Sequence, residues 1–220
     1  MDLWVCQLGR VDYTEAAAAQ ERLRERVRAG ELPETMLLLE HPPVYTVGRR
    51  TAETDLPLPS VGIEVVQTPR GGQLTYHGPG QLVGYPIMRV ENVPEFVLTM
   101  ERAIVAALAD AGLEAGTRLG HRHVGVWVGE RKIASVGIHI SQGVSAHGFA
   151  VNIENDLAPF TSVVACGLPD VQMTSLRAEG VEEGLACFRK RMAFRFCEAF
   201  GRRQRLVTPA RLGLPAPVAA

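Results

Sequence analysis

Regularly spaced apolar residues predict helices in this chain, and the clearest one lies near its middle. It runs from Asn92 to Gly112, where Asn92 can cap the first turn and Pro94 fits within it. Its apolar residues, spaced four apart, are Phe96, Met100, Ile104 and Leu108. We predict that this stripe packs in the core.

Two further helices are predicted toward the ends of the chain. The first begins at Asp12, which has capping-box spacing to Glu15, and it closes at Gly30. Its many charged residues indicate that one face is solvated. The second spans Gly180 to Phe200, and its apolar stripe consists of Leu185, Phe188, Met192 and Phe196.

Short apolar runs bounded by glycine and proline predict the strands. In the first half of the chain these runs are Leu3 to Leu8, Thr35 to Glu40, Val44 to Val47, Val65 to Val66 and Leu82 to Ile87. Farther on, a three-stranded meander is predicted over Val124 to Val128, Lys132 to Ile140 and His147 to Ile153. We find no repeat or linker, so we predict one domain over residues 1–201 and a loosely attached tail over residues 202–220.

Composition argues against several classes of protein. The 220 residues are 46% hydrophobic and 21% charged, with a net charge of -1, as in ordinary globular proteins. The chain shows no basic excess for nucleic acid, no apolar run approaching the ~20 residues that cross a membrane, and no secretory signal pattern.

The cysteines and histidines show no metal-ligand spacing. Cys6, Cys187 and Cys197 fall in predicted strands or helices, and we interpret them as buried or inert small residues. Reduced thiols indicate a cytoplasmic protein. His121 and His123 could share one side of a strand, but no acid or cysteine stands beside them to complete a zinc site. We interpret them as loop residues and predict no bound metal.

The stretch from Arg70 to Ile87, RGGQLTYHGPGQLVGYPI, holds five glycines and no acid. Glycine is a poor helix or strand former that permits close backbone approach, so the stretch is either a plain loop or a ligand contact. Arg70 and the polar tips of Thr75, Tyr76 and His77 favour a ligand contact. Small residues on two predicted strands, Ser135 and Gly137 then Gly148 and Ala150, leave room either for an apolar ligand or for tight packing of the sheet against a helix.

Lys132 and Cys166 are the candidates for catalysis. Lys132 and Lys190 are the only lysines among 23 basic residues, so the other 21 are arginines. An ammonium can lose its proton and a guanidinium cannot, which marks Lys132, whereas Lys190 lies in a basic run typical of a surface. Cys166 stands before Gly167 in a predicted turn. A free thiol of pKa ~8.5 is mostly protonated at pH 7, and a nearby ammonium lowers that pKa. Such a pair is used in acyl transfer.

Five stretches in order resemble the lipoyl(octanoyl) transferases. They are EHPPVYTVGRR (Glu40 to Arg50), the glycine-rich stretch, GVWV with KIASVGIHI (Gly125 to Ile140), HGFAVNIENDL (His147 to Leu157) and ACGLPDVQMTSL (Ala165 to Leu176). The match spans about Leu3 to Phe200 and is more specific than any single motif. The chain departs from the family at Ala165, where proline is usual, and at Glu154, where a small polar residue is common. Residues 120–123 and the tail beyond Gly201 do not match.

The resemblance implies a fold and an activity. The implied fold is a single mixed α/β domain, with a mixed and largely antiparallel sheet flanked by helices, shared with biotin and lipoate protein ligases. The implied reaction moves an octanoyl group from octanoyl-acyl carrier protein to the lysine of lipoyl domains, as the first step of endogenous protein lipoylation. The acceptors are lipoyl domains of 2-oxoacid dehydrogenase complexes and the glycine cleavage H protein. We expect a cytoplasmic monomer that needs no cofactor, nucleic acid or membrane.

The resemblance also implies residue roles. Cys166 is similar to the nucleophile that forms the acyl thioester, and Lys132 to the residue that lowers its pKa. The residues that match the substrate pocket are Arg70, Gly71, Gly72, Gln73, Leu74, Thr75, Tyr76, His77, Ser135, Val136, Gly137, Gly148, Phe149 and Ala150. We expect Gly167 and the Gly71–Gly72 backbone to offer N–H groups to the oxyanion.

Two other functions stay open. One is an ATP-dependent lipoate or biotin ligase of the same fold, which activates the acid as an adenylate and needs no cysteine. The other is a non-catalytic module that binds acyl groups or docks a carrier. Arg49 and Arg50 are candidate contacts for an acidic carrier.

Overall fold

A large mixed sheet is the frame of the molecule. The computed structural model describes residues 1–52, 56, 62–118, 120, 123–161, 163 and 171–215. Within these residues the sheet has the strand order β11-β1-β2-β6-β10-β9-β8-β7, and all neighbours are antiparallel except β1 with β2 and with β11. The strands are β1 (Asp2–Arg10), β2 (Thr35–Glu40), β6 (Gln81–Ile87), β7 (Gly116–Thr117), β8 (Gly125–Val128), β9 (Arg131–Ser141), β10 (Val144–Asn152) and β11 (Arg203–Val207). The predicted mixed, largely antiparallel sheet is confirmed.

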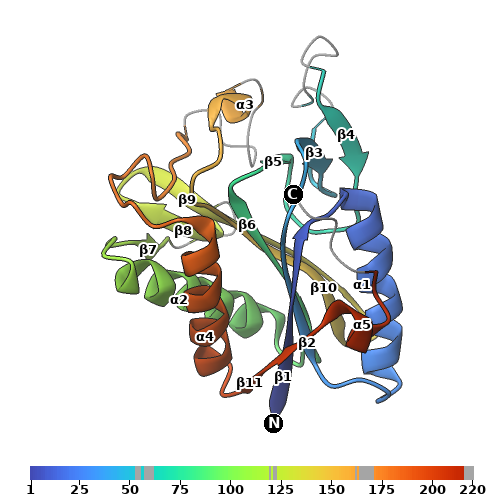
Figure 1. Cartoon of the computed structure of the whole chain (residues 1–220). Helices are drawn as coiled ribbons and strands as arrows, with labels where there is room; N and C mark the ends of the chain where they lie inside the picture. Colours follow the sequence, from blue (N-terminus) through green and yellow to red (C-terminus); the bar gives the residue numbers. More distant parts are fainter. Residues whose placement is uncertain are drawn as a thin grey trace.

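Helices cover both faces of this sheet, and a smaller sheet stands at one end of it (Figure 1). The small sheet has the order β4-β3-β5, formed by β3 (Val44–Val47), β4 (Glu64–Gln67) and β5 (Thr75–His77). The helices are α1 (Tyr13–Arg28), α2 (Val93–Asp110), α3 (Ala158–Thr161), α4 (Leu185–Ala199) and α5 (Pro209–Leu212). None of the described helices is both long and apolar enough to cross a lipid bilayer.

The central strand β2 shows why two helical layers are needed. All of its residues except Glu40 are buried, and its side chains alternate between the two faces of the sheet. Met36 and Leu38 enter the core on the side of α2 and α4. Leu37 and Leu39 enter the core on the side of α1 and α5. The continuous apolar run TMLLLE therefore specifies a strand covered on both sides.

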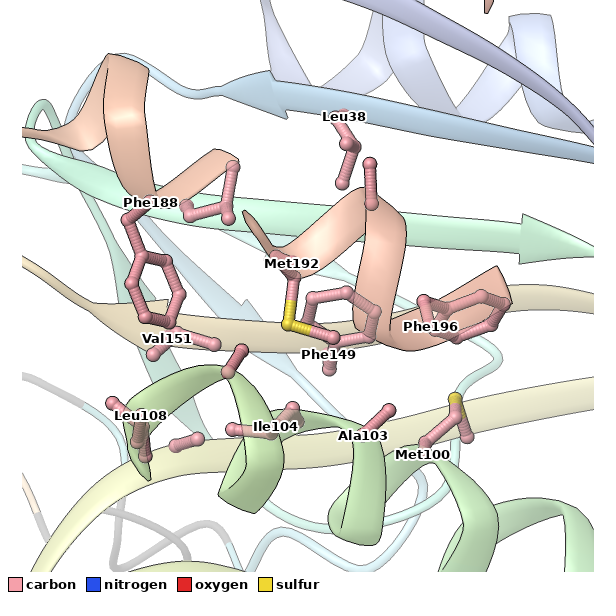
Figure 2. Packing of buried hydrophobic residues seen from close by; sticks show 14 of the residues in the cluster. Leu38, Met100, Ala103, Ile104, Leu108, Phe149, Val151, Phe188, Met192 and Phe196 are labelled. Atoms are coloured by element: carbon pink, nitrogen blue, oxygen red, sulfur yellow. The ribbon is translucent and has the colours of Figure 1, made fainter. Parts of the chain in front are cut away.

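The stripe predicted on α2 is confirmed as part of the larger core. Met100, Ile104 and Leu108 are fully buried, and the Asn92 side chain caps the helix by accepting from the Glu95 N–H at 3.2 Å. Figure 2 shows Phe188, Met192 and Phe196 of α4 gathered with Ile104 and Leu108 of α2 around the sheet residues Phe149 and Val151. Each such large side chain contributes about 1.5–3 kcal/mol of burial free energy.

The helix α4 begins later than its sequence pattern predicts. Residues 177–180 form a turn, in which the Val181 N–H donates to Leu176 O and Gly180 has a positive φ of 81°. The helix therefore starts at Leu185 rather than Gly180. Its Cys187 is exposed, so of the two alternatives, buried or inert, burial is wrong for this residue. Cys6 and Cys197 are buried, and desolvation raises the pKa of each to about 11.

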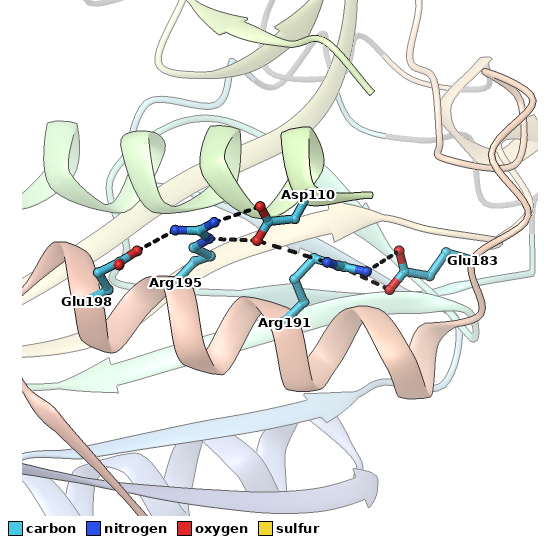
Figure 3. Close-up of polar contacts among 5 residues, drawn as sticks. All are labelled: Asp110, Glu183, Arg191, Arg195 and Glu198. Atoms are coloured by element: carbon cyan, nitrogen blue, oxygen red, sulfur yellow. Dashed lines mark hydrogen bonds and ion pairs between the residues drawn. The ribbon is translucent and has the colours of Figure 1, made fainter. Parts of the chain in front are cut away.

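Ion pairs join the outer face of α4 to the end of α2 (Figure 3). Arg195 donates to both carboxylate oxygens of Asp110 at 2.6 Å, and this pairing lowers the pKa of Asp110. Arg191 pairs with Glu183 at 3.2 Å. Asp110 is the last residue of α2, where its negative charge lies next to the carbonyl groups of the helix end. The positive charges of Arg191 and Arg195 offset this unfavourable interaction. Because these groups are partly solvated, the pairs orient the two helices more than they stabilise them.

We expected a loosely attached tail over residues 202–220, but its described part, residues 202–215, packs against the domain. β11 pairs in parallel with β1, from Asp2 opposite Arg203 to Cys6 opposite Val207. Leu212 and Leu214 are 1% and 7% exposed and join the core beneath α1. The polar sequence RQRLV suits an edge strand, whose outer side faces water, so its pattern resembles a solvated tail.

Two phenylalanines on α4 test how much the core contributes. Phe196 is fully buried and Phe194, two positions away, is 55% exposed. We expect Phe196→Ala to lower the free energy of unfolding by about 3–5 kcal/mol because it leaves a cavity. The matched change Phe194→Ala should cost under about 1 kcal/mol. Urea unfolding of both variants measures the difference, and equal losses would contradict this packing.

Candidate active site

A cavity of about 390 Å³ lies between the glycine-rich segment and strands β9 and β10. From the predicted segment, the cavity is lined by Arg70, Gly72, Gln73, Thr75 and His77. From β9 and β10, it is lined by Ser135, Val136, Gly137, Gly148, Phe149 and Ala150. Most of the residues that match the family's substrate pocket thus surround this one cavity. The volume of the cavity suits a small ligand.

Arg70 fixes the glycine-rich segment to the small sheet. The residue is 7% exposed, and its Nη2 donates to Thr46 O at 2.6 Å and to Thr46 Oγ1 at 2.7 Å. Its Nη1 donates to Gln73 O at 2.8 Å. One guanidinium therefore joins β3 to the segment that roofs the cavity, through charge-assisted hydrogen bonds.

The backbones of the glycine-rich segment and β9 approach each other closely, which explains the glycines where they meet. The Gly71 N–H donates to Ile138 O at 2.9 Å, which docks the segment on β9 beyond the point where β8 ends. A Cβ on Gly137 would lie 3.0 Å from Gly71 O, so a larger residue would push the roof away. Because the Gly71 N–H is already bonded, it does not serve as an oxyanion donor, contrary to our expectation for this residue.

Leu74 and Tyr76 point away from the cavity. Both are buried in a small core cluster with Tyr45 and Phe160, and the Tyr76 and Phe160 rings meet edge to face with centroids 5.4 Å apart. A Cβ on Gly78 would overlap the Tyr76 hydroxyl, which explains the glycine there. These two positions hold the glycine-rich segment in place and do not line the cavity.

Buried histidines and tyrosines close the end of the cavity beside β5. His77, His147, Tyr13 and Tyr85 line it, and His41 lies behind them. Burial lowers the pKa of His41 to about 4 and of His147 to about 3, and it raises the pKa of Tyr13 to about 12. His41, His147 and Tyr13 are therefore uncharged near neutral pH, whereas the buried Arg70 guanidinium, whose charge acts on Tyr13 and His147, is a cation at this end of the cavity.

Hydrogen bonds fix the tautomers of two of these histidines. His41 Nδ1 lies 2.7 Å from Val11 O, so it carries the proton and Nε2 accepts from the Tyr85 hydroxyl at 2.7 Å. His77 Nδ1 donates to Gln81 Oε1 at 2.7 Å, and the Gln81 amide donates to Asn152 Oδ1 at 2.9 Å. A buried network thus connects the cavity with β10.

Lys132 lies in the wall of the same cavity, near the start of β9. It is 2% exposed, and its ammonium lies 5.4 Å from the centre of the Trp127 ring. Gly125 packs against it, because a Cβ there would lie 2.6 Å from Lys132 Cε. The backbone of Lys132 pairs with Gln172 O and with the Thr174 N–H, both at 2.9 Å.

A buried acid lies beside this lysine. Glu101 of α2 is 7% exposed and accepts from the Gly125 N–H at 2.5 Å. Desolvation raises the pKa of Glu101, while the Gly125 N–H and the charge of Lys132 act in the opposite direction. The acid gives the buried ammonium a nearby negative charge, as a buried lysine requires.

Several of these residues were not identified from the sequence. Tyr13, Tyr85, His147 and Glu101 come from elements that meet only in the folded chain. Glu101 follows Met100 of the apolar stripe, so an acid on the buried side of α2 is the signal that could have marked it. Tyr13 and His147 are 134 residues apart and carry no comparable signal.

Two of the predicted site features fall partly or wholly on residues that are not described. Cys166 and Gly167 lie outside the described residues, as do His121 and Arg122. The Trp127 indole donates to His123 O at 2.9 Å, which places His123 beside β8. Among the described residues there is no group of three His, Cys, Asp or Glu side chains arranged to hold a metal ion.

Comparison with known proteins places these features in a family. The model described as "Lipoyl protein ligase A/B catalytic domain" matches residues 12–196. An octanoyltransferase of Solibacter usitatus is 44% identical over 204 residues, which cover 88% of this chain and 91% of that protein. An octanoyltransferase of Mycobacterium leprae is 46% identical over 185 residues, covering 80% and 77%.

Solved structures share the fold at low sequence identity. A lipoate-protein ligase A bound with ATP has a TM-score of 0.82 at 17% identity, covering 94% of this chain and 89% of that one. A putative lipoate protein ligase from T. acidophilum with bound lipoic acid has a TM-score of 0.79 at 18% identity, covering 94% and 90%. A biotin protein ligase from Aquifex aeolicus has a TM-score of 0.54 at 14% identity, covering 91% and 69%.

The neutral histidines predict a pH-dependent stability. Unfolded histidine has a pKa of ~6.5, so below that pH the unfolded chain binds protons that buried His41 and His147 do not. The free energy of unfolding should therefore fall as the pH is lowered from 6.5 toward 4. Urea unfolding at pH 7 and pH 5 measures the loss, and His41→Gln should reduce it. An unchanged loss in that variant would contradict a neutral buried His41.

Proposed function

The chain belongs to the lipoyl protein ligase A/B catalytic-domain family, and we propose that it is an octanoyltransferase that works through a thioester on Cys166. The donor is octanoyl-acyl carrier protein, and the acceptor is the lysine of a lipoyl domain. The observation that carries this proposal is the position of Lys132, a buried amine in the wall of a cavity whose other lining residues, apart from Arg50 and Arg70, are small, apolar or uncharged.

The first step exchanges one thioester for another. The Cys166 thiolate attacks the octanoyl carbonyl, its sulfur–carbon bond forms, and the bond to the carrier's pantetheine sulfur breaks. The positive charge of Lys132 favours the thiolate over the thiol. Gln172, which pairs with the Lys132 backbone, follows Cys166 by only six positions, and this closeness in sequence supports the pairing of the two residues.

The second step makes an amide. The amine of the acceptor lysine attacks the Cys166 thioester, the carbon–nitrogen bond forms, and the cysteine leaves as a thiolate. An ordinary lysine of pKa ~10.4 is almost entirely protonated at pH 7, so the incoming amine needs a base. Formation of the neutral thioester removes the negative charge of Cys166 that Lys132 balanced. Lys132 can then accept the proton of the incoming amine. An arginine could steady the thiolate but could not take up the proton.

The cavity gives the acyl chain a surface that matches it. Val136 and Phe149 offer apolar contact, and Gly137 and Gly148 leave room for the chain. The cavity continues from Lys132 to the uncharged histidines and tyrosines, so the reactive carbonyl and the alkyl chain meet different surroundings. Arg50, which also lines the cavity and is exposed, is available to contact the acidic carrier.

Substitutions at Cys166 and at Lys132 distinguish the two chemical steps. After incubation with octanoyl-acyl carrier protein, intact-mass spectrometry should show an octanoyl adduct on the wild type and none on Cys166→Ser. We expect Lys132→Arg to retain some adduct but to lose transfer to a lipoyl domain by at least about 100-fold, the usual scale of a general base. Equal loss of both steps would contradict the role of Lys132 as base.

The same variants distinguish the other functions. A ligase that acts through an adenylate would keep transferring acyl groups after Cys166→Ser when supplied with ATP and free acid. A module that only docks the carrier would bind it without forming an adduct. Either result would overturn the proposed transferase.

A further inference from the structure

The acid Glu101 lies on a face of α2 that otherwise holds apolar residues. Met100, before it, and Ile104, three positions after it, are fully buried, and Glu101 itself is 7% exposed. A carboxylate withdrawn from water is costly unless a donor or a cation compensates it. Apolar residues can often replace a buried charge without loss of stability, so packing alone does not explain this acid.

Gly125 connects this acid to Lys132. Its N–H donates to Glu101 Oε1 at 2.5 Å, and a Cβ on Gly125 would lie 3.2 Å from Lys132 Nζ. The φ of Gly125 is 133°, in the region that disfavours L side chains, and a Cβ would also overlap Ala134 O. The glycine therefore lets the Lys132 side chain pack against the same residue whose N–H binds the carboxylate.

The other described charges around Lys132 are positive. The cavity that Lys132 lines also holds Arg50 and Arg70, and no Asp or Glu is among its described lining residues. Arg118 lies over the same aromatic ring as Lys132, with its Cζ 4.4 Å from the ring centre. Each of these guanidinium groups disfavours a further positive charge nearby. Glu101 opposes them, because the charge interaction that Lys132 exerts on Glu101 acts equally on Lys132.

We propose that Glu101 is a positioning residue of the reaction, whose carboxylate acts across Gly125 to make Lys132 a stronger base than the surrounding arginines would allow. This inference rests on the proposed acyl transfer. The carboxylate acts on the charge of the amine and touches neither the substrate nor Cys166. Its hydrogen bond to Gly125 also fixes the backbone against which the amine packs.

The proton of Lys132 moves twice in the reaction. In the first step, the Lys132 ammonium gives its proton to the pantetheine sulfur as the carbon–sulfur bond of the donor breaks, so the carrier leaves as a thiol. In the second step, the neutral Lys132 amine takes a proton from the acceptor nitrogen as the carbon–nitrogen bond forms and the Cys166 thiolate leaves. Lys132 thus returns to an ammonium beside a thiolate. A nearby carboxylate favours that ammonium and so strengthens the base of the second step.

The chain has only two lysines, so the charge of Lys132 can be followed directly by NMR. Lysine labelled with carbon-13 at Cε gives one signal for Lys132 and one for Lys190, and Lys132→Arg identifies the first. In a Cys166→Ser background, which removes the thiolate, we expect Glu101→Gln to move the titration midpoint of the Lys132 signal to lower pH by at least about half a unit. Glutamine keeps an oxygen that can accept from Gly125, so the variant removes the charge alone. The Lys190 midpoint should stay the same.

Glu95→Gln supplies the matched control. It removes the same charge from a solvated position of α2, where the Glu95 side chain is 59% exposed, so it should leave the Lys132 midpoint unchanged. With Cys166 restored and octanoylated, Glu101→Gln should lower the maximal rate of transfer to a lipoyl domain at least about threefold, because a weaker base takes up the proton less readily. Glu95→Gln should transfer at the wild-type rate.

The outcomes separate the two proposals. An unmoved Lys132 midpoint in Glu101→Gln, or an equal movement in Glu95→Gln, would overturn the charge effect of Glu101. A moved midpoint with an unchanged rate of transfer would overturn its role in the reaction. If the wild type forms no octanoyl adduct, the acyl-transfer proposal itself fails, whereas the NMR titration still reports whether Glu101 acts on Lys132.

Discussion

The contact between the glycine-rich segment and β9 is the constraint on which the site depends. Arg70 joins this segment to β3, and the Gly71 N–H joins it to the free edge of β9. The approach is close enough that a Cβ at position 137 would lie 3.0 Å from Gly71 O and would push the segment away. If the segment stood farther from the sheet, the cavity would open to water, and the buried surroundings of Lys132 would be lost.

The two ends of the cavity hold different titratable groups. At one end Lys132 and Glu101 place opposite charges in a buried setting beside Trp127. At the other end, burial keeps His147 and Tyr13 neutral. The buried Arg70 guanidinium also acts on both of these groups, so the cavity offers polar contacts at both ends.

Local patterns predicted the frame of this molecule well, and contacts between distant segments explain what they missed. The stripe on α2 and the run TMLLLE show their burial directly in their spacing. Lysine is rare in this arginine-rich chain, and this rarity identified Lys132 as a candidate for catalysis. By contrast, the left-handed backbone of His147, with a φ of 58°, depends on Gln20, a residue 127 positions away, and the burial of Glu101 depends on Gly125. Neither dependence leaves a periodic trace in the sequence.

The parallel pairing of β11 with β1 has a consequence for how the protein is handled. β1 is covered on that side only by residues 203–207, which lie beyond the stretch that defines the family. A fragment cut after Gly201 would bare the N–H and C=O groups of a buried apolar strand, and such an edge invites self-association. We therefore expect a chain that ends at Gly201 to self-associate, although it keeps every described residue that lines the cavity.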